Sequence, residues 1–97
     1  MPTADTCFLY VVECKDDTLY TGISLDVERR IVLHNTGKGA AYTAARRPVK
    51  LLAVWQFKNR SMALRAEFAF KKLNRKSKLL LIEQQQSFYE APFIIIH

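Results

Sequence analysis

The stretch FLYVVECKDDTLYTGIS, residues 8–24, decides the fold of this chain. It holds two short runs rich in apolar and β-branched residues, 8–14 and 18–24, and three polar residues separate them. Runs of this kind favour extended strands, and a polar connection of three residues is typical of a tight antiparallel turn. The stretch therefore predicts a β-hairpin.

The three-residue loop also sets the register of the hairpin, because loop length fixes which residues face each other. It pairs Tyr10 with Gly22. Two residues along, it pairs Val12 with Tyr20. The rings of Tyr10 and Tyr20 then lie on one face of the hairpin as diagonal neighbours. Because glycine has no side chain, Gly22 leaves room beside the Tyr10 ring.

Helix signals and one further strand follow the hairpin. A capped apolar pattern predicts a helix over residues 26–36 that ends at Gly37, and a basic, glycine-containing loop then spans 37–48. Residues 49–57 read as a third strand. A second helix is capped by Asn59 or Ser61 and runs through Leu73, and a third covers about 76–85. The predicted core face of the second helix is Met62, Ala66, Ala69, Phe70 and Leu73.

These elements predict an α+β fold. Its three-stranded, mainly antiparallel sheet is flanked by helices in the order ββαβαα. The 97 residues are enough for one domain, with its core over 7–85 and a C-terminal tail over 86–97. The apolar residues 93–96 of that tail are either a docked extra strand or a segment prone to aggregation.

Charge is concentrated in the middle of the chain. Between Arg29 and Lys78 there are fourteen Lys and Arg residues and a single carboxylate, Glu67, which gives a net charge of +13. Such a segment repels itself unless it meets a polyanion, so it favours a phosphate-bearing partner such as a nucleic acid. A solvated basic surface without a partner is the plainer interpretation.

Other classes of protein are disfavoured. No apolar run approaches the ~20 residues of a membrane span, and the first residues do not read as a secretory signal. Cys7 and Cys14 are too far apart along one strand to form a disulfide, so both are expected to be free thiols in a reducing cytoplasm. Two cysteines and two histidines do not have the spacing of a zinc site.

Five residues are candidates for chemistry, and each has an ordinary structural explanation when it is taken alone. A tyrosine in a strand usually packs, an arginine on a helix is usually solvated, and a histidine near a helix end can act as a cap. A glutamate in a helix commonly pairs with a lysine four residues on, here Lys71. The candidates are Tyr10, Tyr20, Arg30, His34 and Glu67.

Taken together, these residues resemble the GIY-YIG nuclease superfamily. The first tripeptide of its name corresponds to residues 8–10, Phe-Leu-Tyr, and the second to residues 20–22, Tyr-Thr-Gly. Arg30 follows Tyr20 by ten residues, as the catalytic arginine of the family does, and residues 63–71 resemble the helix that bears its metal-binding glutamate. The resemblance covers about residues 8–80. It is closest to small single-domain bacterial members and to the nuclease domain of a eukaryotic endonuclease that cuts branched DNA.

The sequence also departs from the family pattern. Phe8 and Leu9 stand in place of the glycine and isoleucine of the first tripeptide, which strand packing should tolerate. An apolar residue, Ile23, stands directly after Gly22, where many members carry a lysine or another polar residue. The asparagine that supports the site in larger members has no secure counterpart, because Asn74 follows Glu67 too closely.

The resemblance implies a metal-dependent endonuclease that hydrolyses phosphodiester bonds of DNA, with structure-specific repair or recombination as one setting. Glu67 would hold one Mg²⁺ or Mn²⁺ ion, and Arg30 would stabilise charge in the transition state. Tyr20 is the preferred general base, with Tyr10 or His34 orienting the water or relaying the proton, and Gly22 is a structural part of the site. The sugar-phosphate backbone would be bound by Lys38, Arg46, Arg47, Lys71 and Lys72.

Two other functions stay open from the sequence. The chain could be a nucleic-acid-binding module that has kept the fold without catalysis, or an interaction protein that dimerises through its apolar tail. DNA is the expected partner, RNA is not excluded, and neither a membrane nor an obligate protein partner is expected.

Overall fold

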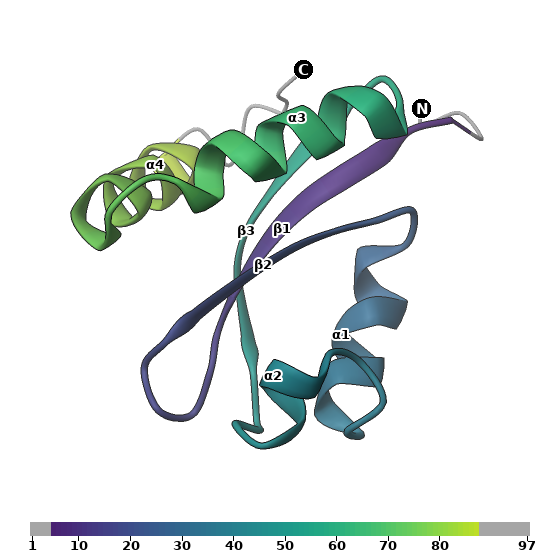
Figure 1. Cartoon of the computed structure of the whole chain (residues 1–97), viewed down its shortest axis with the longest axis vertical. Helices are drawn as coiled ribbons and strands as arrows, with labels where there is room; N and C mark the ends of the chain where they lie inside the picture. Colours follow the sequence, from purple (N-terminus) through teal and green to yellow (C-terminus); the bar gives the residue numbers. More distant parts are fainter. Residues whose placement is uncertain (1–4, 88–97) are drawn as a thin grey trace.

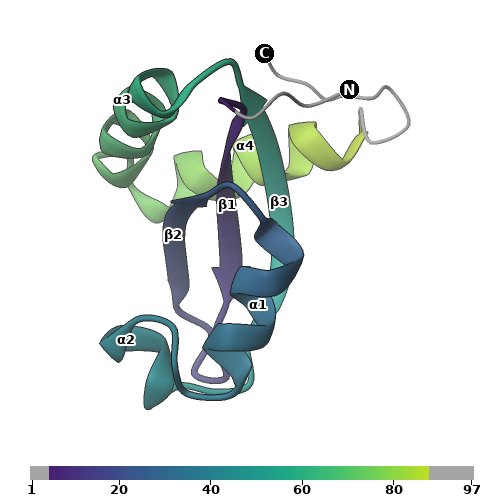
Figure 2. The same ribbon diagram turned by 90° about the vertical axis from the view of Figure 1, so that its right-hand side faces the viewer.

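In the computed structural model, which describes residues 5–87, a three-stranded sheet separates two layers of helices (Figures 1 and 2). The strands are β1 (Cys7–Glu13), β2 (Leu19–Ser24) and β3 (Lys50–Phe57). Their order in the sheet is β2-β1-β3, and both pairs are antiparallel. The fold class predicted from the sequence is therefore confirmed, with β1 at the centre of the sheet.

The hairpin has the predicted register. Tyr10 pairs with Gly22 and Val12 with Tyr20, and the amide of Cys14 donates to the carbonyl of Thr18 at 2.8 Å. Asp17, in the turn, has a φ of 68°. This left-handed conformation is one that aspartate tolerates better than most residues do, which explains a turn without glycine.

Side chains of β1 alternate between two separate cores, because successive residues of a strand point to opposite faces. Leu9 and Val11 pack with Phe70 and Ile82, which belong to α3 (Arg60–Lys71) and α4 (Arg75–Ser87). Tyr10, Val12 and Cys14 form the other core, against which side chains of α1 (Val27–Asn35) pack. Figure 1 shows α3 and α4 on one side of the sheet and α1 on the other.

The first helix agrees closely with its prediction. Its N-cap is Asp26, whose side chain accepts from the amide of Arg29, and Gly37 follows the helix with a φ of 83°. The predicted loop over 37–48, in contrast, contains a short helix, α2 (Ala41–Ala44). This one-turn helix has no side-chain cap, so contacts elsewhere in the fold determine it rather than local sequence signals.

Asn59 is the cap of α3, because its side chain accepts from the amide of Met62 at 2.9 Å. The predicted core face was partly wrong. Met62 and Ala69 are exposed, whereas Ala63 is fully buried. The buried face consists of positions 63, 66, 70 and 73, one step round the helix from Met62, because a small alanine lets the helix backbone approach the sheet closely.

The last described helix, α4, begins one residue before its prediction. The side chain of Asn74 caps it by accepting from the amide of Ser77 at 2.9 Å. Of its predicted apolar residues Ile82 is buried, while Leu79 and Leu80 are largely exposed. Within residues 5–87 no helix is both long and apolar enough to cross a bilayer. The expectation for residues 93–96 lies outside the described residues.

Candidate active site

Tyr10 lies at the centre of the candidate site, on the central strand and on the face that α1 covers. Its side chain is 1% exposed. A Cβ atom built on the paired residue, Gly22, would lie 2.7 Å from the Tyr10 phenol oxygen and 2.9 Å from Cζ. No side chain fits there without displacing the phenol. The predicted structural role of Gly22 thus has a geometric reason, which is the close approach of the Tyr10 ring to the β2 backbone.

His34 comes from the last turn of α1 and is fully buried. Its Nε2 atom lies 2.8 Å from the Tyr10 oxygen, and its Nδ1 atom lies 2.7 Å from the hydroxyl oxygen of Thr43. The Thr43 hydroxyl itself donates to the carbonyl of Ala40 at 3.0 Å. Thr43 must therefore accept from Nδ1–H, which leaves Nε2 to accept from the Tyr10 hydroxyl. The three side chains form one continuous hydrogen-bonded chain.

Burial, assisted by the nearby charge of Arg30, lowers the pKa of His34 below 6.5. Both effects disfavour the imidazolium, so His34 is neutral at neutral pH and its Nε2 atom can accept a hydrogen bond from the Tyr10 hydroxyl. Its side-chain partners are Tyr10 and Thr43, so the simple helix-cap explanation does not describe it. Thr43 was not among the predicted residues. Its only sequence signal is a polar residue within an alanine-rich loop.

The lowered pKa of His34 predicts an acid-sensitive fold. Below pH 6.5 the unfolded chain binds a proton at this residue that the folded chain resists. The free energy of unfolding should therefore be fully retained above pH 6.5 and should fall as the pH drops toward the lowered pKa. Denaturant titrations at pH 7.5, 6.5 and 5.5 measure it. A His34→Asn variant should lose this part of the pH dependence, and an equal slope in both proteins would contradict the assignment.

Tyr20 stands beside this chain on the edge strand β2. Its ring lies edge-on to the His34 ring, with 5.3 Å between centroids, and it is partly exposed. The two predicted tyrosines therefore meet at one histidine, which places three of the five candidate residues in direct contact. Tyr20 is the more accessible phenol, since Tyr10 is covered on all sides.

Arg30 and Glu67 lie close enough to Tyr10 to act on it electrostatically. Burial is the main effect and raises the pKa of the Tyr10 phenol, as do the neighbouring Tyr20 and Glu67, whereas Arg30 opposes the rise. Arg30 reaches the site from α1, and Glu67 comes from α3 on the other face of the sheet. Figure 2 shows α3 above the upper end of β2 and α2 below its lower end.

Glu67 also has the ordinary partner that its position suggests. Its Oε2 atom lies 3.4 Å from Nζ of Lys71, one helical turn on. The Lys71 side chain is 54% exposed and that of Glu67 only 20% exposed. An ion pair with so exposed a lysine contributes at most about 1 kcal/mol, so it does not explain why the carboxylate is mostly covered.

Comparison with known proteins decides the family. Residues 6–80 match the family model described as the GIY-YIG catalytic domain. The chain belongs to this family. It is 52% identical over 80 residues to the UPF0213 protein SAG0778 of Streptococcus agalactiae, covering 82% of this chain and 91% of the relative. It is 46% identical over 87 residues to the UPF0213 protein YazA of Bacillus subtilis, covering 90% and 88%.

Solved structures agree with the fold. The solution structure of the UPF0213 protein BH0048 from Bacillus halodurans is 42% identical, with a TM-score of 0.57, over 88% of this chain and 90% of that one. The protein EF2693 from E. faecalis is 39% identical, with a TM-score of 0.59, over 100% and 99%. This protein is thus a member of a small single-domain branch of the GIY-YIG family. The family domain is a nuclease domain that implies a DNA substrate, and its members generally use divalent metal ions.

The donor atoms of this GIY-YIG site fit a divalent ion that is bound through a single carboxylate. Among residues 5–87 there is no cluster of three or more His, Cys, Asp and Glu side chains that could hold a metal. Mg²⁺ is often bound through one or two carboxylates, with waters and substrate phosphates as its other ligands. Glu67, a single and mostly covered carboxylate, suits this mode of binding. It does not suit a site whose ligands all come from the protein.

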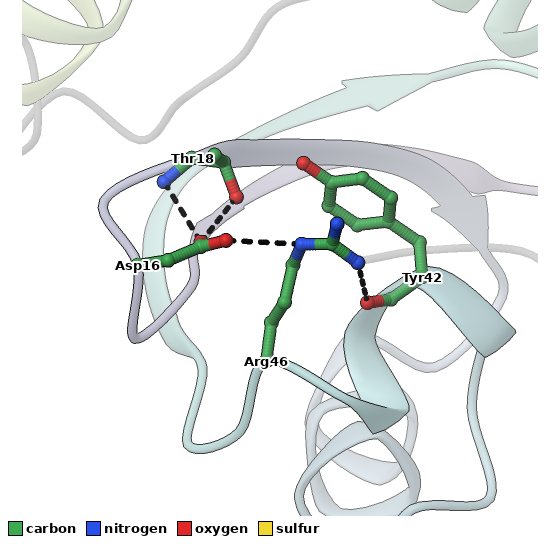
Figure 3. Close-up of polar contacts among 4 residues, drawn as sticks. All are labelled: Asp16, Thr18, Tyr42 and Arg46. Carbon is green, nitrogen blue, oxygen red and sulfur yellow. Dashed lines mark hydrogen bonds and ion pairs between the residues drawn. The ribbon is translucent and has the colours of Figure 1, made fainter.

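The cations predicted to bind the nucleic-acid backbone lie in two groups. Lys38, Arg46 and Arg47 belong to the loop around α2, and Lys71 and Lys72 lie at the end of α3. Three of the five have further contacts besides the Lys71 pair. The Nε atom of Arg47 donates to the carbonyl of Ala44 at 2.9 Å. Nζ of Lys72 lies 4.2 Å from the centroid of the Phe68 ring, and Arg46 binds Asp16 (Figure 3).

Proposed function

We propose that this protein is a metal-dependent endonuclease that hydrolyses phosphodiester bonds of DNA. The observation that carries the proposal is the meeting of two phenols and a neutral buried imidazole beside an arginine and a mostly covered carboxylate. Phosphodiester hydrolysis needs a base for the attacking water and positive charge at the phosphate oxygens. The five residues supply both.

The roles follow from exposure and chemistry. Tyr20, the accessible phenol, is the residue that we assign as general base for the attacking water. The new P–O bond forms as the bond to the leaving oxygen breaks, and that oxygen takes a proton from solvent. The Tyr10–His34–Thr43 chain orients the ring of His34, against which the Tyr20 ring packs edge-on.

Arg30 would brace the phosphate oxygens, because a planar guanidinium donates two parallel hydrogen bonds to such a group. Glu67 would hold the divalent ion, which when bound stabilises negative charge on the phosphate. Lys38 and Arg47 of the α2 loop and the cations of α3 would bind the sugar-phosphate backbone without reading sequence. Structure-specific cutting in DNA repair or recombination is the setting that we propose for this activity.

The first experiment asks whether the protein cuts DNA at all. Labelled single-stranded, branched and duplex DNA are incubated with the protein in Mg²⁺, in Mn²⁺ or in excess chelator. We expect cleavage with either ion and none with chelator. Binding without cleavage under every condition would instead support a non-catalytic module. The Glu67–Lys71 ion pair and the apolar Ile23 favour that second candidate function.

Arg30 provides a sharper test of the mechanism. Loss of a donor that acts on developing charge should lower kcat on the order of 10²–10³-fold. Affinity for DNA should change far less, because many other cations contribute to it. The variant is Arg30→Ala, with Arg30→Lys expected to recover little, since lysine cannot donate in the same paired geometry. Cleavage kinetics and binding are measured separately.

Arg29→Ala is the matched control, because it removes the same charge from an exposed neighbouring position on α1. We expect it to leave kcat near the wild-type value. Equal losses of affinity and turnover in Arg30→Ala would move Arg30 from catalysis to binding.

A further inference from the structure

Three flat groups stack from the candidate site toward the surface. The rings of Tyr20 and Tyr42 are nearly parallel, 24° apart with 6.0 Å between centroids. The guanidinium carbon of Arg46 lies 3.9 Å from the centroid of the Tyr42 ring. Tyr42 is 38% exposed. The stack thus connects the accessible phenol of the site with solvent.

Arg46 is held in place on three sides, as Figure 3 shows. Its Nε donates to Oδ2 of Asp16 at 3.0 Å, its Nη1 donates to the carbonyl of Tyr42 at 2.9 Å, and its plane covers the Tyr42 ring. Asp16 is itself fixed by the hydroxyl and the amide of Thr18, at 2.6 and 3.2 Å. Hydrogen bonds from Thr18 first, and from Arg46, lower the pKa of Asp16. The carboxylate therefore stays ionised and keeps Arg46 in position.

This arrangement of Tyr42 and Arg46 is better suited to contact with a nucleobase than with a phosphate group. The charge of Arg46 is already met by a carboxylate, which weakens it as an anchor for a second anion. Its flat guanidinium and the Tyr42 ring are pre-oriented and partly exposed, and both kinds of surface stack well on nucleobases. In a duplex the faces of each base are covered by its neighbours. Only an unpaired base can use such a surface.

We propose that Tyr42 and Arg46 form a stacking platform for an unpaired nucleobase next to the phosphate that is cut. The inference rests on the proposed function and names its substrate class, which is single-stranded or locally unpaired DNA. Because Tyr42 stacks directly on Tyr20, the stacked base belongs to a nucleotide adjacent to the reacting phosphate. The Asp16–Arg46 contact then orients the stacking surface in addition to joining the hairpin turn to the α2 loop.

The test measures binding and stacking without cleavage. A Glu67→Gln background prevents cutting, and oligonucleotides carrying 2-aminopurine report stacking through fluorescence quenching. We expect the protein to quench 2-aminopurine in a single strand and not in a blunt duplex of the same length. Adding Tyr42→Leu should weaken single-strand binding roughly 5- to 100-fold, the effect of losing one base–aromatic stack, and should remove the quenching. Duplex affinity should not change.

Conservative variants distinguish a base-stacking role of Tyr42 and Arg46 from a purely structural role. Tyr42→Phe keeps the ring and should bind and quench like the parent. Arg46→Lys keeps the charge beside Asp16 but loses the plane, so it should reduce quenching without unfolding the protein. Lys38→Gln, at an exposed loop cation, should weaken single-strand and duplex binding together and leave quenching of the bound strand unchanged.

Equal losses of single-strand and duplex affinity in Tyr42→Leu would overturn the platform, as would an absence of quenching by the parent. These outcomes are independent of the nuclease proposal. Cleavage of duplex DNA by the wild-type protein without quenching would reject the platform alone. Quenching by a protein that cuts nothing would support the platform and reject the nuclease.

Discussion

Replacing Glu67 with glutamine should abolish metal-dependent cleavage and leave folding and DNA binding nearly unchanged. Glutamine has the same size but no charge, so it is a much poorer ligand for a hard divalent cation. The charge stabilisation that such an ion provides is worth several kcal/mol, and each ~1.4 kcal/mol is tenfold in rate. We therefore expect kcat to fall on the order of 10²–10³-fold. Single-turnover cleavage at saturating Mg²⁺, beside a binding titration, measures both quantities.

Two controls make the Glu67 result specific. Glu28→Gln makes the same change at an exposed position of α1 and should retain wild-type cleavage. Lys71→Gln removes the ion pair and keeps the carboxylate. It should preserve metal-dependent cutting while weakening DNA binding slightly. If Glu67→Gln cuts as fast as the wild type, or if Lys71→Gln is the more damaging change, then Glu67 is only the partner of a surface lysine.

A methyl group at Gly22 should be strongly destabilising. In Gly22→Ala the new Cβ would lie 2.7 Å from the Tyr10 oxygen, and the Tyr10 ring is buried, so the ring or the β2 backbone must shift. Overpacking of this kind costs about 1–3 kcal/mol. In a domain of this size that lowers Tm by roughly 5–20 °C. Displacing Tyr10 by even ~1 Å from His34 should also reduce cleavage about 10²-fold. Thermal unfolding and cleavage rates measure the two effects.

A double-mutant cycle tests whether the clash with Tyr10 is the cause. In a Tyr10→Phe background the nearest atom to the new methyl group, the phenol oxygen, is gone. Gly22→Ala should therefore cost less stability there than in the wild type. Purely additive losses would mean that the added methyl group acts through the β2 backbone and not through the Tyr10 ring.

The sequence was sufficient for the elements whose signals are local. The three-residue loop and the alternation of apolar residues determine the hairpin register, and Tyr10 does pair with Gly22. Asn59 was one of two expected caps of the second helix and does cap it, because an N-cap bond forms within a few residues. Asp26 caps the first helix in the same way.

What was missed depends on contacts distant in sequence. The one-turn helix α2 and its Thr43 have no strong local signal, and Thr43 becomes important only because the His34 ring reaches it. The core face of α3 was predicted correctly at Ala66, Phe70 and Leu73 and missed Ala63, whose fit against the sheet has no local signal. The proximity of Glu67 to Tyr10 followed from family resemblance alone. No periodicity relates a helix on one face of a sheet to a phenol on the other.

The alternation along β1 has a practical consequence for engineering. Leu9 and Val11 contribute to the core shared with α3 and α4, while Tyr10 and Val12 belong to the layer that contains the Tyr10–His34–Thr43 hydrogen-bonded chain. Stability can therefore be adjusted at odd-numbered positions of this strand without direct contact with that chain. A library for altered substrate choice would vary the even-numbered side of the sheet and its facing loop. Insertion of a single residue in β1 would exchange the two sets, and it should eliminate folding and activity together.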